Sequence, residues 1–271
     1  ISFHGSQLAA PFLNNHVAST MTDMVLDRFG QKHWISEMRL RGGTDKDIMY
    51  RKIGIQPEPG MKNKALLIET TWNDKAETVV VPSSAHLNFD SAMTAEAWVR
   101  FDPSTAHSVS ILAKLNGYDG DDWYMPPGYN MGFRKNQDKF CINNALVTDK
   151  GEFINWGDCN IGDTLWHHIA FTYDAKADLN NFRTYVDGIL LVEKTVTGKI
   201  RQGDGMLLIG SRTSFYGNNK YFIDEVRLWN RALSQQELLQ NQVTRLTGEE
   251  EGLKMYLSFD DTFKDLSGNG N

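Results

Sequence analysis

The fold is decided by the stretch from Leu165 to Leu233, which reads LWHHIAFTYDAKADLNNFRTYVDGILLVEKTVTGKIRQGDGMLLIGSRTSFYGNNKYFIDEVRLWNRAL. It contains five segments rich in β-branched and aromatic residues: IAFTYD, FRTYVDG, LLVEKTV, MLLIGS and FIDEVRLW. Turn-forming residues separate them, among them Asp187-Gly188 and Gly217-Asn218-Asn219. The segment FRTYV alternates with a period of two, as a strand with two different faces does. This series of strands and tight turns predicts antiparallel sheets packed as a sandwich.

Several short motifs follow one another in a recognisable order. They are VVVP (79–82), TAEAWV (94–99), WHH (166–168), YVDG (185–188) and IDEVRLW (223–229) followed by NRALS (230–234). Over about residues 60 to 240 the chain thereby resembles the laminin-G-like and pentraxin-like domains of the concanavalin A-like lectin/glucanase superfamily. The resemblance implies an all-β fold, a two-sheet antiparallel jelly-roll sandwich. It does not define the ligand, because one fold hosts many functions.

The first 60 residues do not match these motifs and form an N-terminal extension. The segments VLDRF and HWISEMRL, separated by Gly30-Gln31, predict two strands, although the apolar spacing from Met21 to Phe29 also fits a helix. RGGTDKD, residues 41–47, predicts a polar loop. Pro57-Glu58-Pro59-Gly60 is a boundary signal, so we expect the sandwich to occupy residues 61–271.

The C-terminal part predicts a helix over 234–248 and a terminal strand over 253–259. Ser234 is a good N-cap, Glu237 completes a capping box, and Gly248 is expected to end the helix. The tail GLKMYLSFDDTFKDLSGNGN resembles the start of another laminin-G-like unit. It either begins a further repeat or adds an edge or inner strand to this sandwich. We favour the added strand, because an unpaired apolar strand is costly.

Composition limits the classes of partner. The 34 acidic and 28 basic residues give a formal net charge of −6, which argues against nucleic acid. No apolar run approaches the roughly 18 residues that a membrane span requires. Cys141 and Cys159 are spaced for a disulfide across neighbouring strands, or they are two separate thiols. A disulfide, and the family resemblance, would both fit a secreted or cell-surface protein.

Motifs for catalysis are not found. The superfamily that the chain resembles includes glucanases, whose catalytic carboxylates lie on one strand in a Glu-x-Asp-x-x-Glu spacing. This spacing is missing here. Asp224 and Glu225, as neighbours on a strand, are expected to face opposite sides. His167-His168 is interpreted as a packed or surface pair at a strand entry rather than a metal site. The sequence therefore favours a binding protein over an enzyme.

The resemblance also implies a structural calcium ion, because domains of this family often bind one. Calcium takes oxygen ligands from carboxylates, amides and backbone carbonyls. The matching positions here are Glu69, Asp74 or Glu77, and Asp224. The alternative is that these are hydrogen-bonded acids in turns.

The candidate ligand residues lie in three places. The loop NGYDGDDWYMPPGYN, residues 116–130, offers aromatic rings for the apolar face of a sugar and carboxylates and amides for its hydroxyls. Because rim loops cluster in a sandwich, residues from 156–158 and 214–219 were expected to converge with it. The alternative is an ordinary long loop with Trp123 folded onto the sandwich. The full set is Tyr118, Asp121, Asp122, Trp123, Tyr124, Asn130, Trp156, Tyr216 and Asn218.

These observations predict a non-catalytic extracellular module for carbohydrate binding or adhesion, with a glycan or surface glycoprotein as its partner. Two alternatives remain open. One is a divergent glycoside hydrolase on the same fold, which would need two carboxyl groups about 5–10 Å apart in a cleft. The other is a structural or protein-interaction repeat of a surface protein.

Overall fold

The computed structural model describes residues 16–26, 32–40, 46–53, 64–70, 78–106, 108–114, 128–210, 218–260 and 262–271. The chain divides into two compact units. One comprises Ile1–Asn63 with Gln240–Arg245, and the other comprises Lys64–Leu239 with Leu246–Asn271. No helix in the described ranges is long and apolar enough to span a membrane.

The N-terminal unit contains a three-stranded antiparallel sheet. Its strands are β1 (His16–Leu26), β2 (Lys32–Leu40) and β3 (Lys46–Ile53), in the order β1-β2-β3. The predicted strand HWISEMRL lies within β2, and the part of VLDRF that is described, Val25 and Leu26, ends β1. The described residues 21–26 are therefore strand and not helix, and 27–29 lie outside the described residues. The third strand was not predicted, and it begins inside the segment that was expected to be a polar loop.

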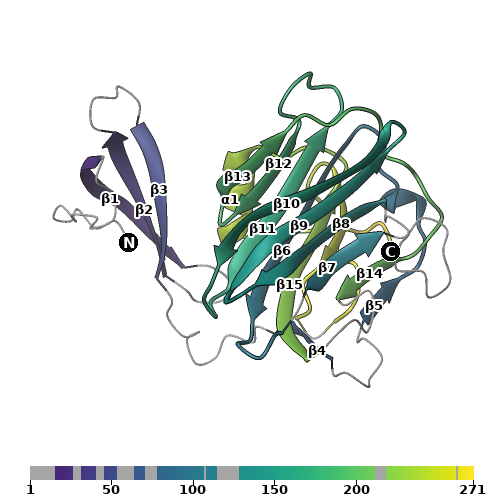
Figure 1. Ribbon diagram of the computed structural model, residues 1–271, viewed down its shortest axis with the longest axis horizontal. Helices are drawn as coiled ribbons and strands as arrows, with labels where there is room; N and C mark the ends of the chain where they lie inside the picture. Colours follow the sequence, from purple (N-terminus) through teal and green to yellow (C-terminus); the bar gives the residue numbers. More distant parts are fainter. Residues whose placement is uncertain are drawn as a thin grey trace. The chain divides into compact units, whose positions relative to one another are not determined.

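The sandwich in the second unit has two antiparallel sheets, as predicted (Figure 1). The first has six strands in the order β10-β9-β8-β7-β14-β5. Their bounds are β5 (Thr78–Val81), β7 (Val109–Lys114), β8 (Tyr129–Asn136), β9 (Lys139–Thr148), β10 (Gly151–Ile161) and β14 (Leu207–Gly210).

The second sheet has seven strands in the order β13-β12-β11-β6-β15-β16, with β4 paired to the other half of β15. Their bounds are β4 (Leu66–Thr70), β6 (Ala92–Phe101), β11 (His167–Asp174), β12 (Phe182–Val186), β13 (Ile189–Lys194), β15 (Asn219–Trp229) and β16 (Leu253–Leu257). A short 3-10 helix, η1 (Ala85–Leu87), follows β5.

The alternation that the sequence predicted sorts the side chains between core and outer face. On β6, Ala95, Ala97 and Val99 are buried in the main core between the sheets. On β12, Phe182 and Val186 join the same core, while Arg183 is exposed on the other side. Burying one face of each sheet against the other is the main stabilising contribution to this fold.

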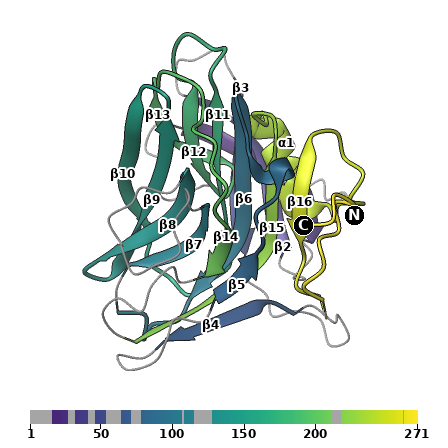
Figure 2. The same ribbon diagram turned by 90° about the vertical axis from the view of Figure 1, so that its right-hand side faces the viewer.

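Helix α1 (Gln235–Val243) covers part of the outer face of the seven-stranded sheet (Figure 2). Its predicted capping box is present: the Ser234 backbone N–H donates to Glu237 Oε2 at 2.7 Å, and the Glu237 N–H donates to Ser234 Oγ at 3.3 Å. The helix ends at Val243, so the prediction that Gly248 ends it is wrong. Gly248 instead takes a φ of 94° in the following turn, a value that few other residues tolerate.

The C-terminal strand pairs with β15 at the edge of the sheet, as predicted. The tail after it folds back onto β16 through polar side chains. Asp265 Oδ1 accepts the Tyr256 N–H at 2.9 Å, and Asn271 Nδ2 donates to the Lys254 carbonyl at 2.7 Å. The segment that resembles the start of another repeat is therefore part of this unit.

A β-bulge interrupts β15 and overturns one expectation. Asp224 pairs with Trp98 and Arg227 with Glu96, so two residues on β15, Glu225 and Val226, are set against Ala97 alone on β6. Glu225 takes a φ of 52° at this point. The extra residue breaks the alternation of the strand. Asp224 and Glu225 therefore do not face opposite sides of the sheet, as they would on an unbroken strand.

Candidate functional site

One row of side chains crosses the outer face of the six-stranded sheet, with one residue from each strand. The pairing sets them side by side in the order Ile154, Ala145, Asn130, Ala113, Leu208 and Val80. The row faces outward because the chain neighbours of Asn130 on β8, Tyr129 and Met131, lie in the core. The two end residues are large and exposed, at 39% for Ile154 and 54% for Val80. Between them Ala145, Ala113 and Leu208 are buried, and Asn130 is half-buried.

Polar groups lie at the centre of this row. Asn130 Oδ1 accepts a hydrogen bond from Ser110 Oγ at 3.1 Å, and its Nδ2 donates to the Asn143 carbonyl at 3.3 Å. Asn143 also faces outward, since Asn144 beside it points inward to Thr184 Oγ1. These two contacts orient the Asn130 amide, while the Asn143 side chain is half-buried. Amide and hydroxyl groups of this kind are suitable partners for sugar hydroxyls.

The predicted ligand loop is attached to two strands of this sheet. It joins β7 to β8, two middle strands of the sheet, and its base is closed by the Gly128 N–H donating to the Lys114 carbonyl at 2.7 Å. Trp156 on β10 is paired with Asn143 in the register. The side chain of Trp156 and all of residues 115–127, which include Tyr118, Asp121, Asp122, Trp123 and Tyr124, lie outside the described residues.

The second predicted loop, which contains residues 214–219, is attached at the other end of the sheet. Lys114, before the first loop, pairs with Leu207 at the start of β14, whereas the second loop leaves β14 after Gly210. The expected convergence of the two loops is therefore not found at their points of attachment. Tyr216 lies outside the described residues. Asn218 is exposed, and its carbonyl accepts the Ala106 N–H at 3.0 Å.

Carboxylates are scarce on this sheet. Strands β5, β7, β8, β9 and β14 contain no aspartate or glutamate. A hydrolase that works with two carboxyl groups would need them to flank a glycosidic bond. Five of the six strands thus offer hydrogen-bonding groups and no pair of acids.

The residues implied as calcium ligands do not come together where they are described. Glu69 is exposed, stands opposite Lys220 in the register, and has its Oε1 3.5 Å from Lys220 Nζ. Asp224 is buried and lies four residues further along β15, about 13 Å away at about 3.3 Å per residue. Because calcium ligands lie about 2.4 Å from the ion, Glu69 and Asp224 do not fit one site. Asp74 and Glu77 lie outside the described residues.

The two histidines each contact acids. His167 Nδ1 lies 2.8 Å from Asp187 Oδ2, and its Nε2 lies 2.9 Å from Asp163 Oδ1. His168 is buried on the next position, with its Nε2 3.2 Å from Glu96 Oε2. In the part of the chain that the structure describes, no group of three His, Cys, Asp or Glu residues is arranged to hold a metal ion.

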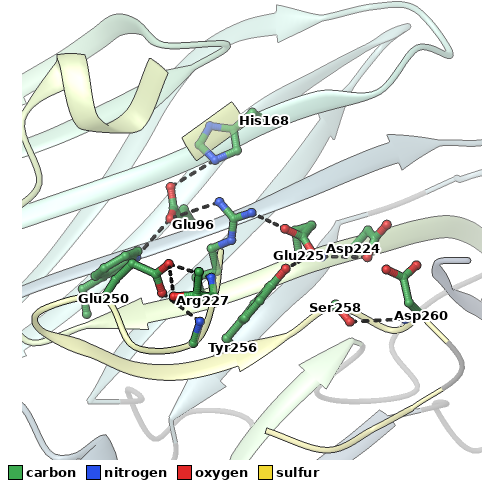
Figure 3. A network of polar contacts seen from close by, with 12 residues as sticks. Glu96, His168, Asp224, Glu225, Arg227, Glu250, Tyr256, Ser258 and Asp260 are labelled. Carbon is green, nitrogen blue, oxygen red and sulfur yellow. Dashed lines mark hydrogen bonds and ion pairs between the residues drawn. The ribbon is translucent and has the colours of Figure 1, made fainter. Parts of the chain in front are cut away.

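A buried charged network lies on the outer face of the seven-stranded sheet, and the sequence did not reveal it (Figure 3). Arg227 is fully buried and forms ion pairs with Glu225 and, at 3.6 Å, with Glu96 Oε1. Tyr256 Oη donates to Glu225 Oε1 at 2.7 Å, and Trp229 Nε1 donates to Glu96 Oε1 at 3.0 Å. The alternation of β6 places Glu96 on this face, but only the bulge brings Glu225 to it.

The network holds Glu96 in its charged form. Burial alone would raise the pKa of this carboxyl. The hydrogen bond from His168, the charge of Arg227 and the bond from Trp229 outweigh burial, so the pKa of Glu96 lies below its ordinary value. An acid with a lowered pKa is poorly suited to donate a proton at neutral pH. We therefore assign this network a structural role.

Comparison with known protein families identifies the fold. The family model described as the concanavalin A-like lectin/glucanases superfamily matches residues 73–239. The chain belongs to this superfamily. The two-sheet jelly-roll sandwich and the family resemblance predicted from the sequence are both confirmed.

Solved structures show the same fold at low sequence identity. A protein from Bacteroides ovatus ATCC 8483, described as a candidate carbohydrate-binding protein, is 16% identical with a TM-score of 0.52, covering 88% of this chain and 65% of that chain. The binding domain of Botulinum neurotoxin DC, solved in complex with rat synaptotagmin II, is 12% identical with a TM-score of 0.50, covering 86% of this chain and 53% of that chain. The chain thus spans less than two thirds of the length of each structure. No curated protein matches.

Proposed function

We propose that this protein is a non-catalytic carbohydrate-binding module that uses the outer face of the six-stranded sheet. The observation that carries the proposal is the cross-strand row with the oriented amide of Asn130 at its centre. The candidate carbohydrate-binding protein from Bacteroides ovatus shares the fold and supports the same assignment. A sugar would place its C–H face near aromatic side chains of the attached loop and its hydroxyls near the amides.

Binding is favoured over hydrolysis by the residues on this sheet. Five of its six strands lack acidic residues, so those five strands offer no pair of carboxyl groups for hydrolysis. We propose that the ligand is a glycan presented in solution or on a glycoprotein. A protein-interaction role remains the alternative that the binding experiment would reveal.

We also propose that the protein is secreted or displayed at a cell surface, with a disulfide between Cys141 and Cys159. The two residues are opposite each other in the β9–β10 register. Opposed Cα atoms of antiparallel neighbours lie about 4.5–5.5 Å apart, within the range of about 4.4–6.8 Å that a disulfide requires. Mass spectrometry of the purified protein under non-reducing conditions should show a mass two hydrogens below that of the reduced chain.

A glycan array followed by calorimetric titration of the best ligand tests the function. Asn143→Ala should weaken binding about fivefold, because one net hydrogen bond contributes about 1 kcal/mol. Trp123→Ala should weaken it about tenfold through the loss of an aromatic contact. Asn230→Ala and Phe263→Ala are the matched controls, since both residues are exposed on other parts of the unit. A protein that binds no glycan, or whose glycan binding survives both site variants, is not the module proposed here.

A further inference from the structure

A cavity of about 260 Å³ lies at one rim of the sandwich, where β6 ends and β8 turns into β9. Phe101 and Phe140 contribute an apolar wall, and their rings are stacked with centroids 3.9 Å apart and an interplanar angle of 15°. Asp102, Asp138 and Asp163 contribute carboxylates from three separate segments. Both rings belong to the core and are only 2% and 5% exposed, so the accessible lining is mostly polar and acidic.

Local hydrogen bonds fix two of these carboxylates. Asp102 Oδ1 accepts the Ser104 N–H at 2.9 Å and the Ser104 hydroxyl at 2.7 Å. Asp163 Oδ1 accepts the Leu165 N–H at 2.8 Å and lies 2.9 Å from His167 Nε2. Each contact engages the same oxygen of its carboxylate. These hydrogen bonds therefore hold the Asp102 and Asp163 carboxylates in fixed positions.

The charge balance of the cavity is negative. Lys135 is the one basic residue among the described lining residues. Its Nζ donates to the Thr105 carbonyl and lies 5.4 Å from the centroid of the Phe140 ring. The two hydrogen bonds from Ser104 also lower the pKa of Asp102, which keeps that carboxyl ionised at neutral pH.

We propose that this cavity binds a small molecule that carries a primary ammonium group, the chemistry shared by an unacetylated amino sugar and an aliphatic diamine. An ammonium group has three donors and a positive charge, and it would form charge-assisted hydrogen bonds with the carboxylates. A uronic acid would be repelled by the same carboxylates, and a neutral sugar would lack the ionic contact.

Titration of the full chain with four compounds tests the proposal. Glucosamine and 1,4-diaminobutane carry the ammonium group, while glucose and glucuronate are the neutral and anionic comparisons. We expect both amines to bind, with affinity that falls as salt is added, and glucose and glucuronate to bind at least tenfold more weakly. If glucosamine binds and diaminobutane does not, the proposal holds and the source is an amino sugar. Equal affinity for all four compounds, or no binding of either amine, would overturn it.

Two aspartate variants locate the site. Asp138→Asn should weaken amine binding about tenfold, because a hydrogen bond to a charged group is lost. Asp178→Asn is the matched control, an exposed aspartate on the turn between β11 and β12. Equal melting temperatures of the two variants would show that both fold. Amine binding that Asp138→Asn leaves unchanged would place the site elsewhere and refute the assignment.

The proposal for the cavity and the proposal for the glycan-binding face can be tested separately. Asn143→Ala and Trp123→Ala should leave amine binding unchanged, and Asp138→Asn should leave glycan binding unchanged. A loss of glycan binding in Asp138→Asn would instead mean that the cavity is part of the glycan site, and the proposal of a second site would be wrong.

Discussion

Replacing Arg227 by methionine should destabilise the sandwich by about 3–5 kcal/mol, the cost of breaking a buried ion pair by removing one partner. Arg227 is fully buried, and its guanidinium contacts both Glu225 and Glu96. Methionine preserves much of the side-chain volume, so the loss is electrostatic rather than a cavity. Glu225 would keep the bond from Tyr256 and Glu96 the bond from Trp229, which limits the loss to this range.

Urea denaturation at pH 7, followed by tryptophan fluorescence, measures the loss as a lower midpoint with an unchanged slope. Arg183→Met is the matched control, because Arg183 pairs with Glu193 at 2.7 Å but its side chain is 45% exposed. A surface pair of this kind contributes about 0–1 kcal/mol. Adding Glu225→Gln to Arg227→Met should recover part of the loss, since one stranded charge is then removed. If Arg227→Met costs no more than Arg183→Met, the network does not hold the sheet as argued.

The same variant changes the response to acid. In the wild type the pKa of Glu96 is lower folded than unfolded, so the folded state gains stability that is present above about pH 4.5 and is lost as the pH falls through the lowered pKa. Without Arg227, one of the causes that lower this pKa is removed. The stability of Arg227→Met should therefore decline at a higher pH than that of the wild type. Identical profiles of unfolding midpoint against pH would contradict this account.

Three further predictions concern stability, each measured by urea or thermal unfolding. Ser234→Ala removes the N-cap of α1 and should cost about 1 kcal/mol, with no effect on glycan binding. Gly248→Ala should cost more than this, because the residue has a φ of 94° and an added Cβ would overlap the Leu266 carbonyl oxygen. Burial raises the pKa of Tyr129 and of Tyr221, so the folded state holds protons that the unfolded state releases, and stability should fall as the pH rises above about 10. An unfolding midpoint that is flat to pH 11 would contradict the last of these.

Local pattern was enough to predict the two sheets, because it determines which side chains each strand can bury. The period-two alternation of FRTYV, which forms β12, predicted its two faces correctly. The capping box of α1 was also predictable, since it depends on residues three positions apart. The end of α1 was not, because the helix stops at Val243 without a local signal. The turn at Gly248 is held by Glu250, whose carboxylate accepts the backbone N–H groups of Thr247 and Gly248.

The candidate site depends on register, which the sequence did not supply. Asn130 was predicted because it ends the loop of aromatic, acidic and amide residues at 116–130. Asn143 was not predicted as a site residue. The register places Asn143 opposite Gly132, two residues along β8 from Asn130 and on the same face of the sheet. The points at which the two loops are attached, after Lys114 of β7 and after Gly210 of β14, also depend on strand pairing and lie at opposite ends of the sheet.

The two outer faces of this sandwich differ in what the chain does with them. On the seven-stranded sheet, Leu238 of α1 and Leu246 after it join a second apolar cluster with Trp229 and Tyr256, and the adjacent acids are paired with Arg227. On the six-stranded sheet, the central strands carry small residues and amides and lack acids. A face that must be covered needs apolar area and compensated charge, whereas a face that binds sugars needs room and uncharged hydrogen-bonding groups. The uncharged hydrogen-bonding groups therefore favour the six-stranded sheet as the face proposed for recognition, while the buried charges around Arg227 lie on the other sheet.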